Sequence, residues 1–109
     1  MTVAIRPART QVIAAFRRLV DLYAPDRRLL SKATVTLFED VQEFVVAERD
    51  DEVVGCGALH VMWEDLAEVR TLAVDPTATG SGIGGRLLRE LVSRGQKLGV
   101  SRIFCLTFE

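Results

Sequence analysis

The chain of 109 residues has little of what several classes of protein require. Its two cysteines, Cys56 and Cys105, lie far apart in apolar segments and lack the CxxC or Cys/His spacing of metal sites. We therefore expect buried, reduced thiols that form neither a disulfide nor a metal site. The one histidine, His60, lies in an apolar run, where a hydrogen-bonded strand position is favoured over a catalytic role.

Long hydrophobic runs and an excess of one charge are missing too. The apolar runs are far shorter than the ~20 residues of a membrane helix, and residues 1–9 contain no signal-peptide core. The formal net charge is −1, with interspersed charges and no basic run, which argues against nucleic acid or an anionic membrane as partner. We expect a cytoplasmic protein with a small-molecule partner, folded as a single domain over residues 1–109.

Glycine, by contrast, is concentrated in one stretch. The loop Gly80-Ser81-Gly82-Ile83-Gly84-Gly85 follows an apolar strand candidate, Val69–Val74, and precedes a helix candidate. Glycines let backbone N–H groups turn toward a ligand, and the first helical turn adds unpaired donors and the positive end of its dipole. This order of strand, loop and helix predicts a site for a phosphate group. The apolar face of the helix should consist of Leu87, Leu88, Leu91, Val92 and Leu98.

Two kinds of nucleotide-binding loop also bind phosphate through backbone N–H groups at the start of a helix. The stretch lacks the Gly-Lys-Ser/Thr ending with which a nucleoside-triphosphate loop reaches the terminal phosphate and magnesium. Residues 80–85 do match the G-x-G-x-x-G of dinucleotide-binding folds, and Glu109 closes the next strand, where a ribose-binding acid is expected. In those folds the first glycine directly ends the strand, whereas Asp75–Thr79 intervene here, and further βα units would have to follow. The dinucleotide interpretation is therefore the weaker one.

Hydrophobic periodicity predicts a helical N-terminal part followed by a sheet. In the N-terminal part we expect a strand at 2–5 ended by Pro7, a helix at 10–23 capped by Thr10, and a short helix at 27–32. Residues 34–40 are either a strand or an extended loop.

Three antiparallel strands should follow, at 44–49, 52–62 and 67–74, with a hairpin turn at Asp50-Asp51. Gly55 and Gly57 within the middle strand indicate a bulge or the close approach of another backbone. The helix after the glycine loop should end at Gly99, before a last strand at 102–108.

Leu72-Ala73-Val74-Asp75-Pro76, followed by the glycines of 80–84, resembles the acyl-CoA site of the GNAT superfamily of N-acetyltransferases. The pattern of that site is (Arg/Gln)-x-x-Gly-x-(Gly/Ala) after such a strand. Thr79 stands where the pattern has Arg or Gln, so one side-chain contact to the pyrophosphate is missing while the backbone donors remain. A wider set of segments resembles the short, single-domain N-acetylglutamate synthases and covers nearly the whole chain: 36–37, 41–44, 54–61, 68–71 and 106–109.

The resemblance implies an α/β fold of the GNAT type, α+β layered, with a mixed, mostly antiparallel sheet flanked by helices. It implies acetyl-CoA as co-substrate, no metal, and transfer of the acetyl group to the α-amine of an amino acid, expected to be glutamate. That reaction would open arginine biosynthesis. Two alternatives remain: an N-acetyltransferase with another amine substrate, and a truncated, non-catalytic acyl-CoA-binding module.

The resemblance also implies roles for single residues. The bulged fourth strand would pair its backbone with the pantetheine arm and direct one N–H at the thioester oxygen, while the loop would hold the pyrophosphate. The cofactor-binding positions implied in this way are Leu72, Ala73, Val74, Thr79, Gly80, Ser81, Gly82, Ile83, Gly84 and Gly85.

Glu68 lies where many GNAT members keep an acidic base, which an α-amine needs because it is largely protonated at neutral pH. Strand alternation puts Arg70 on the same face, where it would hold a substrate carboxylate. The alternative is a cross-strand ion pair at the surface. Lys32 is a second candidate for contact with an acidic substrate, against the alternative that residues 27–32 form a solvated basic face.

Many GNAT enzymes protonate the departing thiolate with a tyrosine on a helix after the fifth strand, and this sequence ends at Glu109, before such a helix. Tyr23 is the only tyrosine. Either the sequence is a fragment of a longer enzyme, or the thiolate leaves without help from such a residue. We expect a C-terminally truncated domain that lacks the C-terminal helix and hairpin, with the general acid unassigned. Its last strand would be an uncovered edge over Ile103–Phe108, which predicts a homodimer through that strand.

Overall fold

The computed structural model describes residues 3–15, 18–19, 38–78 and 80–105. The predicted helix at 27–32, residues 34–37 and the end of the last predicted strand, 106–108, lie outside this part of the chain. Short helical pieces also occur at 13–15, 18–19 and 38–39. The elements in chain order are β1 (Val3–Pro7), η1 (Thr10–Val12), η3 (Val41–Glu43), β2 (Phe44–Arg49), β3 (Glu52–Trp63), β4 (Leu66–Val74), η4 (Pro76–Ala78), α3 (Ile83–Leu98) and β5 (Arg102–Cys105), where η marks a single 3₁₀ turn.

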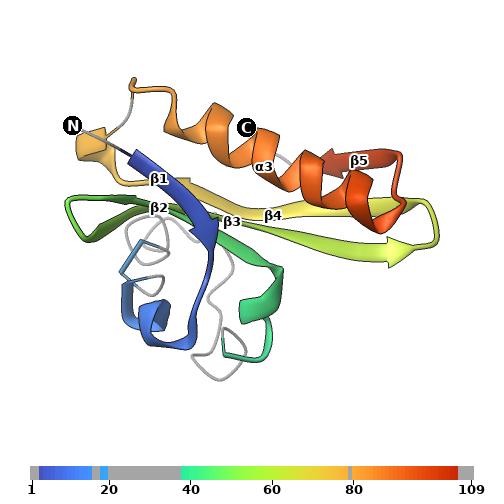
Figure 1. The fold of residues 1–109 in the computed structure, drawn as a ribbon, viewed down its shortest axis with the longest axis horizontal. Helices are drawn as coiled ribbons and strands as arrows, with labels where there is room; N and C mark the ends of the chain where they lie inside the picture. The colour runs from blue at the N-terminus through green and yellow to red at the C-terminus, as the bar shows by residue number, and fades with distance from the viewer. Residues whose placement is uncertain (1–2, 16–17, 20–37, 79, 106–109) are drawn as a thin grey trace.

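The strands form one sheet in the order β1-β2-β3-β4-β5. Neighbouring strands are antiparallel except β4 and β5, which are parallel because α3 carries the chain back between them. Helix α3 lies over one face of the sheet, and η1 and η3 lie on the other side (Figure 1). The predicted mixed, mostly antiparallel sheet between helical layers is therefore confirmed.

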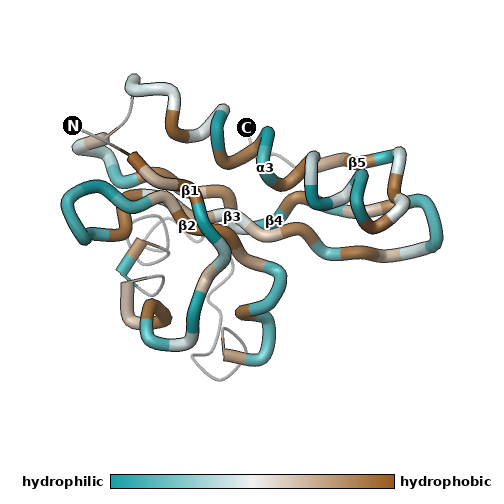
Figure 2. Tube along the Cα trace, viewed as in Figure 1, coloured by the Kyte–Doolittle hydropathy of each residue, from teal (hydrophilic) through white to brown (hydrophobic). Residues whose placement is uncertain are grey.

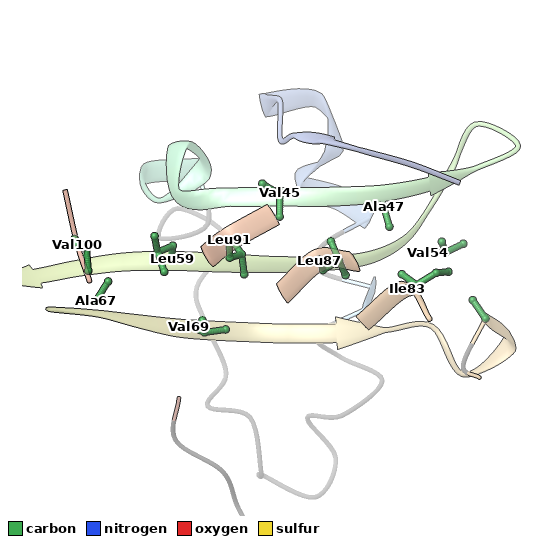
Figure 3. Packing of buried hydrophobic residues seen from close by; sticks show 11 residues of the cluster. Val45, Ala47, Val54, Leu59, Ala67, Val69, Ile83, Leu87, Leu91 and Val100 are labelled. Carbon is green, nitrogen blue, oxygen red and sulfur yellow. The ribbon is translucent and has the colours of Figure 1, made fainter. Parts of the chain in front are cut away.

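The sheet has a hydrophobic core on each face because the side chains of its strands alternate. On the α3 face, Ile83, Leu87 and Leu91 lie over the strands among Val45, Leu59 and Val69 (Figure 3). On the opposite face, Phe44, Val46, Val53, Cys56, Ala58 and Ala73 pack against Val12, Ile13 and Leu19 of the N-terminal segment. Apolar segments accordingly run along the strands and recur along α3, while polar segments gather at the turns (Figure 2).

The apolar face of α3 differs from the predicted one. Ile83, Leu87 and Leu91 are buried at a spacing of four, but Leu88 is 41% exposed and Leu98 is 66% exposed. Because the residues that face the sheet recur every four positions, Leu88, one position after Leu87, points away from it. Gly95 continues the buried row, and a Cβ there would lie 2.9 Å from Ile103 Cδ1, so glycine lets α3 approach β5 closely.

The predicted hairpin turn and the predicted end of α3 are confirmed, and the predicted N-cap of the first helix is wrong. Asp50 and Asp51 both have positive φ, 54° and 65°, the conformation of a two-residue hairpin turn. Gly99 ends α3 in the left-handed conformation with φ 96°, as predicted. The residue before the first helical turn is Arg9, not Thr10, and its side chain makes no capping bond. Within the described residues, no helix is both long and apolar enough to cross a membrane.

Candidate functional site

Strand β4 bulges near its end. Cys56 pairs with Ala73 and Ala58 pairs with Arg70, so the single residue Gly57 of β3 faces two residues of β4. The first of these two, Thr71, has φ 53°, a conformation that a β-branched residue adopts only when its surroundings enforce it. The glycines of β3 predicted a bulge, and the structure has it on the strand opposite them.

Contacts from β3 and α3 hold the bulge in place. A Cβ on Gly57 would lie 3.0 Å from Leu72 Cδ1 and 3.1 Å from Leu91 Cδ1, so the absent side chain makes room for the extra residue. The Cys56 thiol donates a hydrogen bond to the Thr71 carbonyl oxygen, at 3.6 Å. Burial raises the pKa of this thiol to about 12, so the proton that makes the bond stays on the sulfur at neutral pH.

The bulge exchanges the faces of the strand. Before it, Val69 packs on the α3 face, so Glu68 and Arg70 point to the opposite face. After it, Val74 packs on the α3 face and Ala73 on the opposite one, which an unbroken alternation would not allow. The bulge thereby separates a polar segment of β4 from the apolar segment that leads into the glycine loop.

A hydrogen-bonded turn connects β4 to the loop. The Asp75 N–H donates to the Val54 carbonyl at 2.8 Å, and its carboxylate accepts from the Thr77 N–H at 2.9 Å and the Thr77 hydroxyl at 2.8 Å. Arg18 donates to the same carboxylate at 3.1 Å and to the Val53 carbonyl at 3.2 Å. The bonds from Thr77, and after them the bond from Arg18, lower the pKa of Asp75 below its ordinary value.

Sequence analysis did not single out Asp75 and Arg18. The order Asp-Pro-Thr is a readable signal for a turn in which a carboxylate accepts from the backbone two residues later. No comparable signal exists for Arg18, which lies 57 positions from Asp75 in the sequence.

The glycine loop turns into α3 through two residues with positive φ, Gly80 at 83° and Gly82 at 80°. The first N–H that bonds back within the helix is that of Arg86, to the Gly82 carbonyl at 3.1 Å. The N–H groups of Ile83, Gly84 and Gly85 precede this ladder and have no partner within the helix. The first turn has no acidic residue, so the positive end of the dipole is not neutralised by its own side chains.

An open hollow of about 310 Å³ lies at this helix start. The residues that line it are Val74, Ala78, Gly80, Gly82, Ile83 and Gly84. The Ser81 hydroxyl closes the loop by donating to the Ala78 carbonyl at 2.5 Å. The loop therefore offers backbone donors beside an open hollow, which is the chemistry of a phosphate site. Thr79, the position of the departure from the superfamily pattern, lies outside the described residues.

A second polar cluster lies on the face of β4 opposite α3. Arg70 Nε donates to Glu68 Oε1 at 2.6 Å, and Glu68 is only 7% exposed. Strand alternation predicted that the two residues share a face, and this is confirmed. The predicted alternative of a cross-strand surface pair is not what the structure contains, because both residues belong to β4 and Glu68 is buried.

The remaining predicted positions have different outcomes. His60 binds Glu43 through Nδ1 at 2.8 Å, as expected of a hydrogen-bonded strand residue.

Cys56 is buried, but Cys105 is exposed, which corrects the prediction that both thiols are buried. It lies at the end of β5, an edge strand of the described sheet, which has a neighbouring strand on one side only. Lys32 lies outside the described residues. The described part of the chain contains no group of three or more His, Cys, Asp or Glu side chains placed to hold a metal ion.

The fold and the loop together define an α/β domain with a backbone anion site at the end of an inner strand. The sequence profile of the Acetyltransferase (GNAT) family matches residues 13–109, and the chain belongs to this family.

Two relatives are amino-acid acetyltransferases. The one from Mycobacterium tuberculosis is 53% identical, with 96% of this chain and 62% of the relative covered. The one from Neisseria meningitidis is 33% identical, with 96% of this chain and 24% of the relative covered. The chain thus spans less than two thirds of the length of either protein.

Two solved structures are similar over nearly the whole chain. Rv2747 from Mycobacterium tuberculosis, crystallised with CoA, has a TM-score of 0.91 at 52% identity, with 97% of this chain and 65% of that chain covered. N-acetylglutamate synthase from Neisseria gonorrhoeae, complexed with coenzyme A and N-acetyl-glutamate, has a TM-score of 0.94 at 31% identity, with 98% and 26% covered.

Proposed function

We propose that this chain is an acetyl-CoA-dependent N-acetyltransferase that acts on the α-amine of an amino acid, with glutamate as the substrate. The observation that carries the proposal is the arrangement of β4, in which a buried carboxylate, a bulge and a glycine anion loop follow one another within 17 positions, from Glu68 to Gly84. The names of the similar amino-acid acetyltransferases and the CoA and N-acetyl-glutamate complex of the gonococcal enzyme support it.

The cofactor would bind along the end of β4 and over the loop. The N–H groups at the start of α3 suit the pyrophosphate, and the backbone of Leu72–Val74 suits the amides of the pantetheine arm. Among the described residues, β5 pairs with β4 only over Leu66–Val69, so no described strand competes for the outer edge of β4 beyond that point. The proposal needs no metal, since the thioester is already activated toward an amine.

The reaction requires a neutral amine, a polarised thioester and a way for the thiolate to leave. Glu68 would take the proton of the amine and Arg70 would hold the substrate carboxylate. Arg70 uses Nε for Glu68, and none of the described residues accepts a hydrogen bond from its two Nη groups, which suit a second carboxylate. Lys32 is proposed as a further contact to an acidic substrate. One backbone N–H of the bulged segment would stabilise the oxyanion of the tetrahedral intermediate.

We further propose that residues 1–109 act as one domain and that the product serves arginine biosynthesis. The functional test is thiol release from acetyl-CoA in the presence of single amino acids, with glutamate, glutamine, aspartate and a dipeptide as the panel. Turnover highest with glutamate supports the proposal, and turnover highest with another amine replaces the substrate.

Tight CoA binding without turnover on any amine would instead indicate an acyl-CoA-binding module. A thermal-shift comparison tests the dinucleotide interpretation, because a ligand that binds the folded protein raises its melting temperature. An increase with CoA but not with NAD fits an acetyltransferase or an acyl-CoA-binding module, and an increase with NAD alone fits a dinucleotide-binding protein.

A further inference from the structure

An arginine of the N-terminal segment reaches the point where the chain leaves β4 for the glycine loop. Just beyond β4, the Asp75 N–H donates to the Val54 carbonyl of β3 at 2.8 Å. Beside this bond, Arg18 Nη2 donates to the Val53 carbonyl at 3.2 Å and Arg18 Nη1 donates to the Asp75 carboxylate at 3.1 Å. One guanidinium therefore joins the N-terminal segment, the start of β3 and the turn after β4.

The Asp75 carboxylate divides its two oxygens between Thr77 and Arg18. Oδ1 accepts both bonds from Thr77, and Oδ2 accepts the bond from Arg18. The Asp75 side chain is 13% exposed, whereas that of Arg18 is 52% exposed. A carboxylate with so little access to water depends on its protein partners, so water replaces a lost guanidinium only in part.

The neighbour of Arg18 in the sequence holds this part of the N-terminal segment against the sheet. Leu19 is fully buried in the core on the face opposite α3, together with Val12 and Ile13. The segment is therefore fixed by apolar packing, and the Arg18 guanidinium connects it to the turn at Asp75.

Two further bonds connect this turn to the hollow at the start of α3. The Asp75 carbonyl accepts from the Ala78 N–H at 2.8 Å, and the Ala78 carbonyl accepts from the Ser81 hydroxyl at 2.5 Å. Ala78 is buried and lines the hollow with Gly80 and Gly82. A displacement of Asp75 would therefore move the loop that presents N–H groups to a ligand.

We propose that Arg18 is a positioning residue for the pyrophosphate of acyl-CoA and that it acts through Asp75. The proposal rests on the proposed function, in which the glycine loop binds the pyrophosphate. Arg18 holds the turn at Asp75 before the cofactor arrives, so the loop loses less conformational freedom on binding. That smaller loss appears as higher affinity for the cofactor.

The first test is isothermal titration of CoA into Arg18→Met, which keeps most of the aliphatic stem and removes the guanidinium. We expect the Kd for CoA to rise about fivefold, the effect of roughly one hydrogen bond. Arg18→Lys should raise it less, because an ammonium group keeps the charge but lacks the planar fork that joins two acceptors. If Arg18→Met does not fold, Arg18→Gln takes its place with the same expected rise.

Arg6→Met is the matched control for charge. Arg6 also pairs with a carboxylate, that of Glu48, but the pair joins β1 to β2 and has no contact with the loop. This variant removes the same charge and should leave the affinity for CoA unchanged. An equal loss of affinity in Arg6→Met, or unchanged affinity in Arg18→Met, overturns the proposal.

A double-mutant cycle tests whether the effect passes through Asp75. Asp75→Asn keeps an oxygen for Thr77 and turns the atom that faces Arg18 into a donor. In this background, Arg18→Met should change the Kd for CoA by less than about twofold, because the bond it removes is already lost. A full fivefold change in both backgrounds contradicts an action through Asp75.

The kinetic readout separates positioning from a general loss of stability. In Arg18→Met we expect the KM for acetyl-CoA to rise about fivefold with kcat unchanged, since the loop is apart from Glu68. A fall in kcat without a change in this KM, which is the result of partial unfolding, contradicts the proposal. If the unmodified chain binds CoA but acetylates no amine, the enzymatic function fails, while the titrations still decide the role of Arg18. If it does not bind CoA, both proposals fail.

Discussion

Glu68 is the residue on which the proposed chemistry depends most, and Arg70 is its partner in the structure. A carboxylate with 7% exposure is stable only when it is paired, and the Nε of Arg70 supplies that pairing at 2.6 Å. The same guanidinium is proposed to hold the substrate. Arg70 would therefore both stabilise the buried Glu68 carboxylate and hold the substrate, so a change at Arg70 affects both.

We expect Glu68→Gln to lower kcat about 100-fold at neutral pH, with partial recovery as the pH rises and the free amine becomes abundant. Arg70→Met should raise the KM for an acidic amino acid and, because it also leaves Glu68 without its partner, lower kcat. Arg70→Lys keeps the charge and should lose less of both. Steady-state kinetics over pH is the measurement, and Glu64→Gln, in the exposed β3–β4 turn, is the control.

The two thiols should differ in reactivity because one is buried and the other is exposed. Cys56 is buried with its pKa raised to about 12, and Cys105 is exposed. At pH 8 a thiol reagent should modify Cys105 quickly and Cys56 only when the protein unfolds, since the thiolate is the reactive form. Mass spectrometry of the labelled chain, with and without guanidinium, reads this directly. Rapid double labelling of the folded protein would contradict the buried thiol.

A pH effect on stability follows from the same thiol. The folded pKa of Cys56 lies above its ordinary value of 9.0, so its contribution to stability is complete below pH 9 and is lost as the pH rises toward 12. The unfolding free energy of the unmodified protein should therefore fall more steeply above pH 9 than that of Cys56→Ala.

At the scale of elements, the loop and the first turn of α3 together form the proposed anion site. Gly82 and Gly99 stand at the two ends of the helix, both in the left-handed conformation and both without an atom within 4 Å of an added Cβ. Gly84 differs from both, because its φ is helical and an added Cβ would make an ordinary contact with Val74 at 3.8 Å. Substitutions at these three glycines therefore distinguish the effect of backbone strain from the effect of a side chain at the proposed ligand site.

Gly84→Val should leave the melting temperature of the free protein nearly unchanged and weaken CoA binding at least about tenfold, because the side chain projects beside the pyrophosphate site. Gly82→Val should weaken binding as well and also cost roughly 1–2 kcal/mol of stability through the positive φ. Gly99→Val is the matched control: it should cost roughly the same strain and leave CoA affinity intact. Isothermal titration and thermal melts measure both quantities, and unchanged affinity in Gly82→Val and Gly84→Val rules out the loop as the pyrophosphate site.

At the scale of the whole molecule, the feature that bears on self-association is the sheet edge formed by β5. Within the described residues, β5 is the last strand and pairs on one side only, with few charges along it. An exposed strand edge presents unpaired N–H and C=O groups and tends to pair with another chain. Self-association through β5 stays a prediction of the sequence that the single chain does not test.

We expect the chain to sediment as a dimer or larger species at micromolar concentration and to shift toward monomer in Phe104→Lys and Cys105→Lys. A charge on the edge strand is a common device against edge pairing. Leu88→Lys, which adds the same charge to an exposed position of α3, should not change the association state. A monomer for the unmodified chain would show that the edge is protected.

The sequence by itself determined the features that follow from local periodicity and local stereochemistry. Apolar runs predicted β2 and β3 almost to the residue, two aspartates predicted the hairpin turn, and glycines predicted both the loop before α3 and the end of α3. Each of these depends on neighbours a few positions away, where sequence spacing and spatial spacing are the same.

Only the tertiary structure decided which distant residues meet. The residue at which β4 bulges, Thr71, the bond from Arg18 to Asp75, and the bond between Glu43 and His60 all depend on strand register and on which side chains are buried together. A shift of one residue in a strand exchanges its two faces, so side-chain placement after a bulge cannot be read from alternation alone. The sequence therefore predicts where along the chain the proposed site lies, and packing decides which side chains lie together there.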